Sequence, residues 1–168
     1  LTININKPFF GQHDWSPQWN GNIARNHLRY GPLITKLGSV SAGGPITWEP
    51  KSYFTHYPPL FPLILAAGYT VFGFSEAALR ITVIFFSLLT ILGIYCLAKT
   101  LFEADRAFLA TIFTIISPLF LYYGKMPVQE AVILPFTVWS VYFYFEWFKN
   151  DKLTHFIICL VFLLLSFL

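Results

Sequence analysis

Hydrophobic and polar positions divide the chain into a mixed N-terminal part and a strongly apolar remainder. From about residue 79 onward, long apolar runs alternate with short charged turns. The runs cover 81–98, 107–123, 131–148 and 153–168. The first three approach the roughly 20 residues that a helix needs to cross a bilayer. The pattern predicts an all-α polytopic membrane protein, in which residues 1–78 form an outer first loop and residues 79–168 form transmembrane helices.

The N-terminal part predicts two helices that lie outside the spans. Ser16 and Pro17 suit a helix entry, with serine as N-cap and proline at the first helical position, and the helix should end near Tyr30. A glycine-rich loop at 38–45 follows, and its spacing matches no phosphate-binding loop. The segment 58–72 is apolar but short for a span, which favours a juxtamembrane helix on the membrane surface.

Composition supports a membrane protein and excludes several other classes. Hydrophobic residues make up 56% of the chain and charged residues only 11%, whereas soluble domains carry about 25% charged residues. The net charge of +3 is dispersed and does not suggest nucleic-acid binding. Cys96 and Cys159 lie in apolar runs and indicate neither a disulfide framework nor a metal site. Because the chain starts without Met and stops inside an apolar run, we expect it to be a fragment.

Charged turns predict the topology. Two of them, 99–106 and 149–152, each carry two Lys or Arg residues and should face the cytoplasm. The turn 125–130 and the first loop then face outward, which implies a multi-pass protein of the plasma (inner) membrane. If the segment 58–72 lies on the surface, Asp14 and Glu130 share the extracytoplasmic face.

An outer carboxylate beside cations suits transfer of a sugar from a lipid phosphate. Phosphate already leaves well, so the reaction needs one base for the acceptor hydroxyl and cations for the departing phosphate. Asp14 is the candidate base, and a single displacement would invert the anomeric centre. Candidates to face the phosphate are Arg25, Arg29, Arg80 and Lys125.

Each of these residues has a simpler interpretation that stays open. Asp14 could cap the helix that follows it, and Glu130 could be an acidic residue favoured by a helix dipole. Arg80 and Lys125 could extend toward lipid headgroups, as could Arg25. The histidines lack zinc spacing, and no cofactor is certain. A divalent ion held by Asp14, His56 or Glu130 is an open alternative.

Three motifs, in order, resemble a known family. They are His13-Asp14-Trp15 before a helix, Thr55-His56-Tyr57-Pro58-Pro59-Leu60, and Lys125-Met126-Pro127-Val128-Gln129-Glu130. The sequence is similar to the GT-C class of membrane glycosyltransferases, closest to family 39, which includes protein O-mannosyltransferases and aminoarabinose transferases.

The resemblance implies a GT-C-like helix bundle and assigns roles to residues. It implies that Asp14 is the catalytic carboxylate, that Glu130 is a second acidic site residue, and that the Pro-Pro-Leu helix lies along the outer surface. Candidate substrate-binding residues are His13, Arg25, His56, Tyr57, Arg80 and Lys125. The partners implied are a polyprenyl-phosphate-linked sugar donor, an acceptor lipid, glycan or protein, and the bilayer.

Departures from the family pattern leave the sugar and acceptor open. Trp15 stands where mannosyltransferases have Glu, Tyr57 where better-known branches have His or Lys, and Glu130 where Asp is usual. Two rival functions remain: a non-catalytic transporter or flippase for lipid-linked sugars, and a metal-dependent oligosaccharyltransferase. A transporter would place charges near the middle of its spans, whereas here the acidic residues sit at outer ends.

Overall fold

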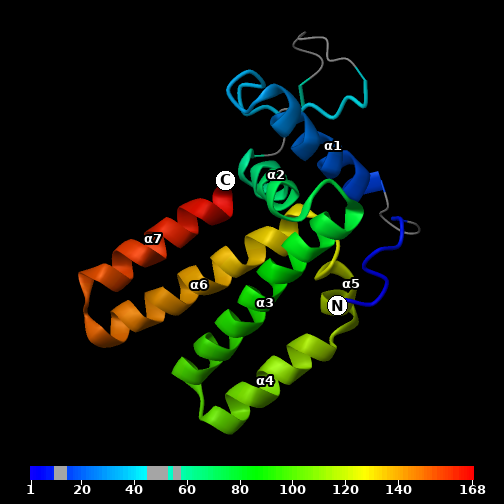
Figure 1. Cartoon of the computed structure of the whole chain (residues 1–168). Coiled ribbons are helices and arrows are strands. Elements are labelled where there is room, and N and C mark those ends of the chain that lie inside the picture. The colour runs from blue at the N-terminus through cyan, green and yellow to red at the C-terminus, as the bar shows by residue number, and fades with distance from the viewer. Residues whose placement is uncertain (10–14, 45–52, 55–57) are drawn as a thin grey trace. The chain divides into compact units, whose positions relative to one another are not determined.

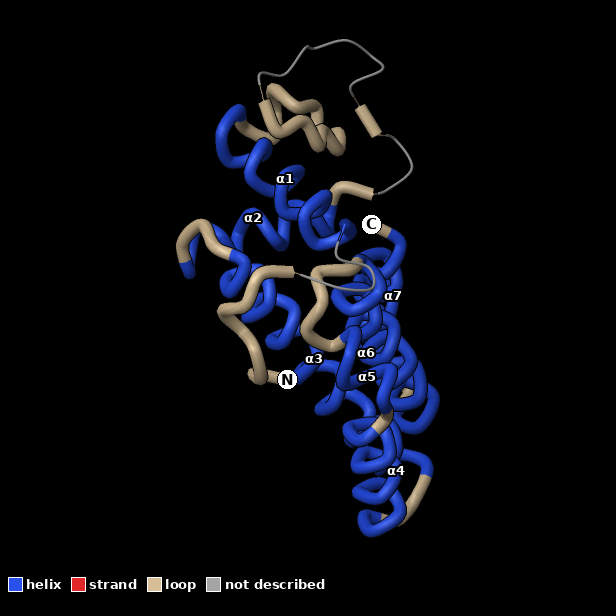
Figure 2. Tube along the Cα trace, turned by 90° about the vertical axis from the view of Figure 1, so that its right-hand side faces the viewer, coloured by secondary structure: helices blue, strands red, loops and turns tan. Residues whose placement is uncertain are grey.

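The computed structural model describes residues 1–9, 15–44, 53–54 and 58–168, and these ranges are helical with connecting loops (Figures 1 and 2). The described part contains no extended strand, only an isolated bridge between Ser39 and Phe54. The predicted all-α fold is confirmed. The helices are α1 (Trp15–Tyr30), α2 (Leu60–Phe72), α3 (Glu76–Leu101), α4 (Ala104–Ile116), α5 (Pro118–Tyr123), α6 (Gln129–Asn150) and α7 (Leu153–Phe167).

The chain forms two compact units. One unit comprises Thr2–Thr82, Met126–Val128 and Leu168, and the other comprises Leu1, Val83–Lys125 and Gln129–Phe167. Helix α3 contributes its first turns to one unit and the remainder to the other. The predicted functional boundary after residue 78 stays a prediction.

Within the described part of the chain, two helices are long and apolar enough to cross a membrane, α3 with 26 residues and α6 with 22. Both extend beyond the runs 81–98 and 131–148 because charged and polar residues continue the helix past its apolar part. The shorter helices α2 and α7 are also apolar. The predicted end of the second helix, Phe72, is confirmed, and Gly73 follows it with φ of 81°. Such a backbone angle favours glycine.

The predicted span 107–123, which contains Pro118, is divided into two helices. The chain leaves the helix at Ser117, where ψ is 127°, and α5 restarts at Pro118. Proline has no N–H and disfavours helical angles in the residue before it. Pro135, by contrast, lies within α6, which continues through it.

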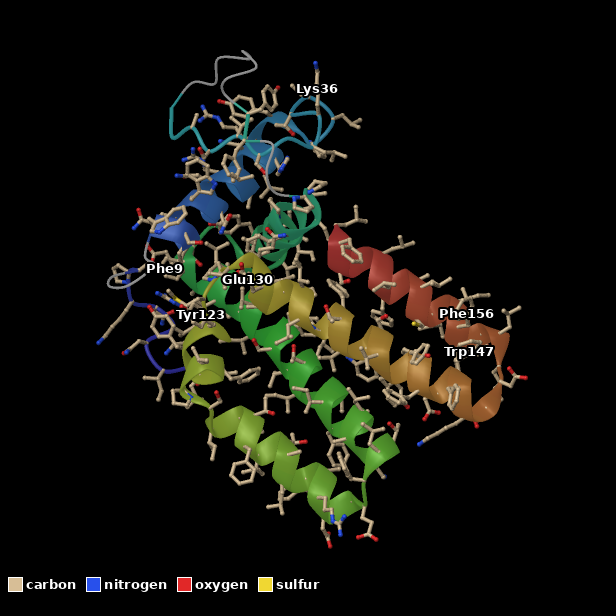
Figure 3. All side chains as sticks on the ribbon, turned by 180° about the vertical axis from the view of Figure 1, so that it is seen from behind. Phe9, Lys36, Tyr123, Glu130, Trp147 and Phe156 are labelled. Atoms are coloured by element: carbon tan, nitrogen blue, oxygen red, sulfur yellow. The ribbon has the colours of Figure 1, made fainter. Side chains whose placement is uncertain are left out.

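Helices α6 and α7 lie side by side as a hairpin (Figures 1 and 2). Aromatic rings fill their contact: Phe143 and Phe162 stack with centroids 5.8 Å apart and planes 7° apart, and Trp147 packs on Phe156 at 4.8 Å (Figure 3). The hydroxyl of Ser140 donates to the Cys159 carbonyl at 3.0 Å. Only Asp151 and Lys152 separate the two helices, so the chain reverses there and the packed helices run antiparallel.

Helices α1 and α2 pack together in the other unit. Ile23 and Ala24 of α1 and Leu65 of α2 are at most 1% exposed. Helix α1 begins at Trp15, so the prediction that Ser16 caps a helix starting at Pro17 is wrong. Ser16 lies within the first turn, where its hydroxyl oxygen accepts a hydrogen bond from Asn20 at 3.3 Å.

Candidate functional site

Four of the predicted site residues lie outside the part of the chain that the structure describes. They are His13, Asp14, His56 and Tyr57. Asp14 immediately precedes Trp15, the first residue of α1. Its predicted role as a base, and the alternative of a helix cap, both stay predictions.

Helix α1 is tied to a loop more than one hundred residues away. The buried amide of Asn20 donates to the carbonyl oxygen of Pro127 at 3.1 Å. Residues 126–128 belong to the same compact unit as α1. A buried carbonyl left without a partner costs about 1–3 kcal/mol, so this bond fixes the loop against the helix. The sequence offered no signal for it, since a single Asn in a helix has no distinctive pattern.

Arg25 and Asn26 hold the loop that follows α1. One guanidinium nitrogen of Arg25 donates to the carbonyls of Ala42 and Gly43 at 3.1 and 3.2 Å. The Asn26 amide donates to the carbonyls of Val40 and Ala42 at 2.7 and 3.0 Å. These contacts give Arg25 a role in ordering residues 40–43. Its predicted contact with substrate stays a prediction.

Arg80 is held by the first residues of the chain. Its guanidinium donates to the carbonyls of Ile5 and Lys7, at 2.7 Å for Ile5, and lies 3.9 Å from the centre of the Phe9 ring. The residue is only 7% exposed. The alternative that Arg80 merely reaches out to lipid headgroups is therefore wrong in this structure. Backbone carbonyls and an aromatic face stabilise its positive charge instead.

Glu130 lies in the first turn of α6 and lines a cavity of about 660 Å³ in its own compact unit. Figure 3 shows Glu130 beside Tyr123, which ends α5. The remaining wall is mostly apolar, including Phe113 and Leu134, with hydroxyl groups from Ser87 and Thr90 of α3. An apolar hollow with a few polar groups is typical of a ligand site.

Ser87 fixes the loop at one edge of this cavity. Its buried hydroxyl donates to the Gly124 carbonyl at 2.7 Å. A side chain at Gly124 would meet the Phe120 carbonyl at 2.6 Å, so only glycine fits without a shift. The adjoining Lys125 is half-buried and interacts with other residues of the chain. Ser87 and Thr90 were missed from sequence, although their spacing of three residues within an apolar run could have indicated a shared helix face.

Comparison with known protein families identifies the family to which the chain belongs. The sequence profile of the family described as dolichyl-phosphate-mannose-protein mannosyltransferase matches residues 56–168, which is more than half of the chain. The chain belongs to this family. It is therefore related to membrane glycosyltransferases of the GT-C type, and the resemblance to that class is confirmed. No curated protein and no solved structure gives a significant match.

The mannosyltransferase family match covers part of the predicted site. Arg80, Lys125 and Glu130 lie inside the matched range, as do the residues of the Glu130 cavity. Asp14 lies ahead of that range. The apolar helices α3 and α6 agree with the membrane location expected of this family.

A metal site receives no support from the described ranges. Within 1–9, 15–44, 53–54 and 58–168, no group of three His, Cys, Asp or Glu side chains is placed to hold an ion. Two of the three candidate ligands, Asp14 and His56, fall outside these ranges. A divalent ion in this mannosyltransferase relative stays an open alternative.

Proposed function

We propose that the protein transfers a sugar from a polyprenyl-phosphate donor to an acceptor hydroxyl on the extracytoplasmic face of the plasma membrane. In this reaction the acceptor oxygen bonds to the anomeric carbon while the bond from that carbon to the phosphate oxygen breaks. Asp14 takes the hydroxyl proton, and the lipid phosphate leaves with the bonding electron pair. One displacement inverts the anomeric centre. The family's printed description, which names a lipid-phosphate-linked mannose, supports this donor class.

The hydrogen bond from Asn20 to Pro127 is the observation that carries the proposal. Asp14 directly precedes α1, and Asn20 lies five residues after Trp15, about 7.5 Å along the helix axis. Pro127 is two residues from Lys125 and three from Glu130. Consecutive Cα atoms are about 3.8 Å apart, so the chain itself keeps these two residues near Pro127. The bond thus holds the helix that follows Asp14 against the segment 126–128, which lies between Lys125 and Glu130 in the chain.

The cavity beside Glu130 supports a lipid-linked donor. Its apolar wall suits isoprene units of a carrier, because burying such groups is favourable by about 25 cal/mol per Å². Glu130 at this cavity would hold sugar hydroxyls or a divalent ion, and Lys125 would offset charge on the departing phosphate.

The proposal is tested on the full-length protein in lipid nanodiscs with a polyprenyl-phosphate sugar donor. Loss of a general base typically slows the chemical step by about 10²–10⁴-fold. We expect Asp14→Asn to lose transfer by at least this factor while donor binding stays near normal. Asp151→Asn is the matched control, because Asp151 lies in the α6–α7 turn, is exposed, and has φ of 52°, which Asn tolerates.

Substantial turnover by Asp14→Asn would show that Asp14 is not the base. Glu130→Gln should raise the KM for the donor more than it lowers the unfolding temperature. If Glu130→Gln lowers only the unfolding temperature and leaves the KM unchanged, Glu130 serves only the helix dipole. Repeating the assay after removal of divalent ions separates the two roles of Glu130.

A further inference from the structure

A second cavity lies entirely within the unit that contains α1 and α2. It measures about 380 Å³ and is enclosed by α1, the end of α2 and the start of α3. It shares no lining residue with the Glu130 cavity. Small-molecule sites run from roughly 300 to 1,000 Å³, so this cavity has room for one small ligand.

Aromatic rings form one part of its wall. Tyr69 and Phe74 pack with ring centroids 4.6 Å apart and planes inclined by 40°. Phe9 also lines the cavity, and the Arg80 guanidinium lies over its ring. Phe9 and Tyr69 are at most 7% exposed, so both rings are held by packing. Phe74, by contrast, is 64% exposed and presents its ring to solvent. Together these rings form an aromatic surface of the kind that contacts the C–H face of a sugar ring.

Polar groups form the rest of the wall. Gln18 and Asn22 are four residues apart on α1 and therefore share one helix face. Glu76 begins α3. Among the residues that the structure describes, these three side chains make no hydrogen bond or ion pair. Gln18 and Glu76 are exposed, so their polar groups face solvent and are accessible to a ligand.

The mixture of groups selects the chemistry of the ligand. Two amides both donate and accept, whereas the carboxylate of Glu76 only accepts. An anion would face the Glu76 charge, and the guanidinium groups of Arg80 and Arg25 are both engaged with backbone carbonyls. A metal ion would need more ligands than one carboxylate, and no three-residue group occurs among described residues. Neutral hydroxyl groups, which both donate and accept, match the set.

The hydroxyl of Tyr69 adds a donor beside α1. A Cβ atom at Gly21 would lie 2.9 Å from the Tyr69 hydroxyl oxygen, so glycine lets this ring reach the helix backbone. Burial, with a smaller effect of Glu76, raises the pKa of Tyr69 to about 12. The hydroxyl therefore keeps its proton at neutral pH and can donate to a ligand oxygen.

We propose that this cavity binds a single sugar ring, with its C–H face on Tyr69 and Phe74 and its hydroxyls on Gln18, Asn22 and Glu76. The assignment deepens the proposed function and rests on it. Pro17 and Gln18 of the cavity wall follow Asp14 by three and four residues. The ring belongs either to the donor or to a glycan acceptor.

Binding of methyl α-D-mannopyranoside to the full-length protein in nanodiscs, measured by ligand-observed NMR, tests the proposal without requiring transfer. One hydrogen bond to a charged group contributes about 1.5–3 kcal/mol, which corresponds to roughly 10-fold or more in affinity. We expect Glu76→Gln and Asn22→Leu each to weaken binding at least about fivefold. Glu103→Gln, an exposed glutamate that precedes α4, is the matched control and should bind as wild type.

Equal binding by Glu76→Gln and Glu103→Gln would overturn the proposal, as would no detectable binding by wild type. Because Glu76 is exposed, its variant should fold even if Asn22→Leu does not. In transfer assays with Glu76→Gln, a raised KM for the lipid donor alone would show that the bound ring belongs to the donor. A raised KM for a glycan acceptor alone would show that the ring belongs to the acceptor. Glycoside binding that depends on Glu76 without any sugar transfer would leave the cavity assignment standing and refute the proposed function.

Discussion

Replacing Asn20 with alanine removes an amide that joins α1 to the loop 126–128. The side chain is 6% exposed, and its nitrogen donates to the Pro127 carbonyl at 3.1 Å and to the Ser16 hydroxyl at 3.3 Å. The substitution deletes both bonds. The Ser16 hydroxyl can rotate to another partner, whereas the Pro127 carbonyl is fixed by the backbone and loses its donor.

The cost follows from that unpaired carbonyl. A buried acceptor left without its partner costs about 1–3 kcal/mol. If this bond limits local opening of the loop, the opened population rises by roughly 5- to 150-fold, because about 1.4 kcal/mol is a factor of ten. We expect no comparable change in helices that do not contact Asn20.

Hydrogen exchange at the Val128 amide measures this opening. That amide donates to the Met126 carbonyl at 2.7 Å, so exchange requires the loop to open. The matched control is Asn150→Ala, since the Asn150 amide also donates to a backbone carbonyl, that of Glu146 at 3.0 Å, but in an exposed position. The control should leave Val128 exchange unchanged.

Unchanged Val128 exchange in Asn20→Ala would refute the reasoning, because the bond would then contribute nothing to holding the loop. If exchange rises as expected, sugar transfer should fall as well, without a change in the expression level. Faster Val128 exchange with full transfer activity would show that sugar transfer does not require the loop 126–128 to be held against α1.

Two further predictions concern packing and pH. Gly68→Ala should lower the midpoint temperature of thermal unfolding, because the new Cβ would lie 2.0 Å from the Thr82 hydroxyl oxygen. Such overpacking costs about 1–3 kcal/mol of stability, whereas the better helix propensity of alanine returns at most about 1 kcal/mol. Thr82→Ala should restore part of the loss and Gly43→Ala, with open space around it, should change little, so a fully stable Gly68→Ala would contradict the packing. Burial lowers the pKa of His27. Its Nδ1 lies 2.9 Å from the Thr35 hydroxyl oxygen, and that hydroxyl donates its own proton to the Pro32 carbonyl. Nδ1 therefore carries the proton of the neutral ring and donates to Thr35. Because the unfolded state binds this proton more readily, the contribution of neutral His27 to stability is full above pH 6.5 and falls as the pH drops through and below that value. The unfolding temperature of His27→Gln should therefore fall less on acidification than that of the wild type. Equal decreases would disprove the lowered pKa of His27.

The sequence was sufficient to predict the helices whose signals are local. Apolar runs of nearly 20 residues predicted α3 and α6, and proline and glycine predicted the limits of α2. The span 107–123 is divided at Ser117, because Pro118 lacks an N–H and disfavours helical angles in the residue before it. A local proline effect decided the backbone there, although the apolar character of the segment was correctly identified.

Sequence patterns were less informative about the site, because its geometry depends on distant partners. The carbonyls that hold Arg80 belong to residues more than 70 positions away, and the partner of Asn20 is 107 positions away. Nothing in the local sequence distinguishes an arginine paired with backbone from one that faces a phosphate. Glu130 was identified from its position at the outer end of a span, and its cavity became apparent only with the fold.

The interruption at Ser117 has a geometric consequence. One extended residue separates α4 from α5, so its two backbone dihedrals set the angle between these helices. Residues on both sides of Ser117, including Phe113 and Tyr123, border the same hollow. The backbone conformation of a single residue therefore helps to determine how wide the hollow is.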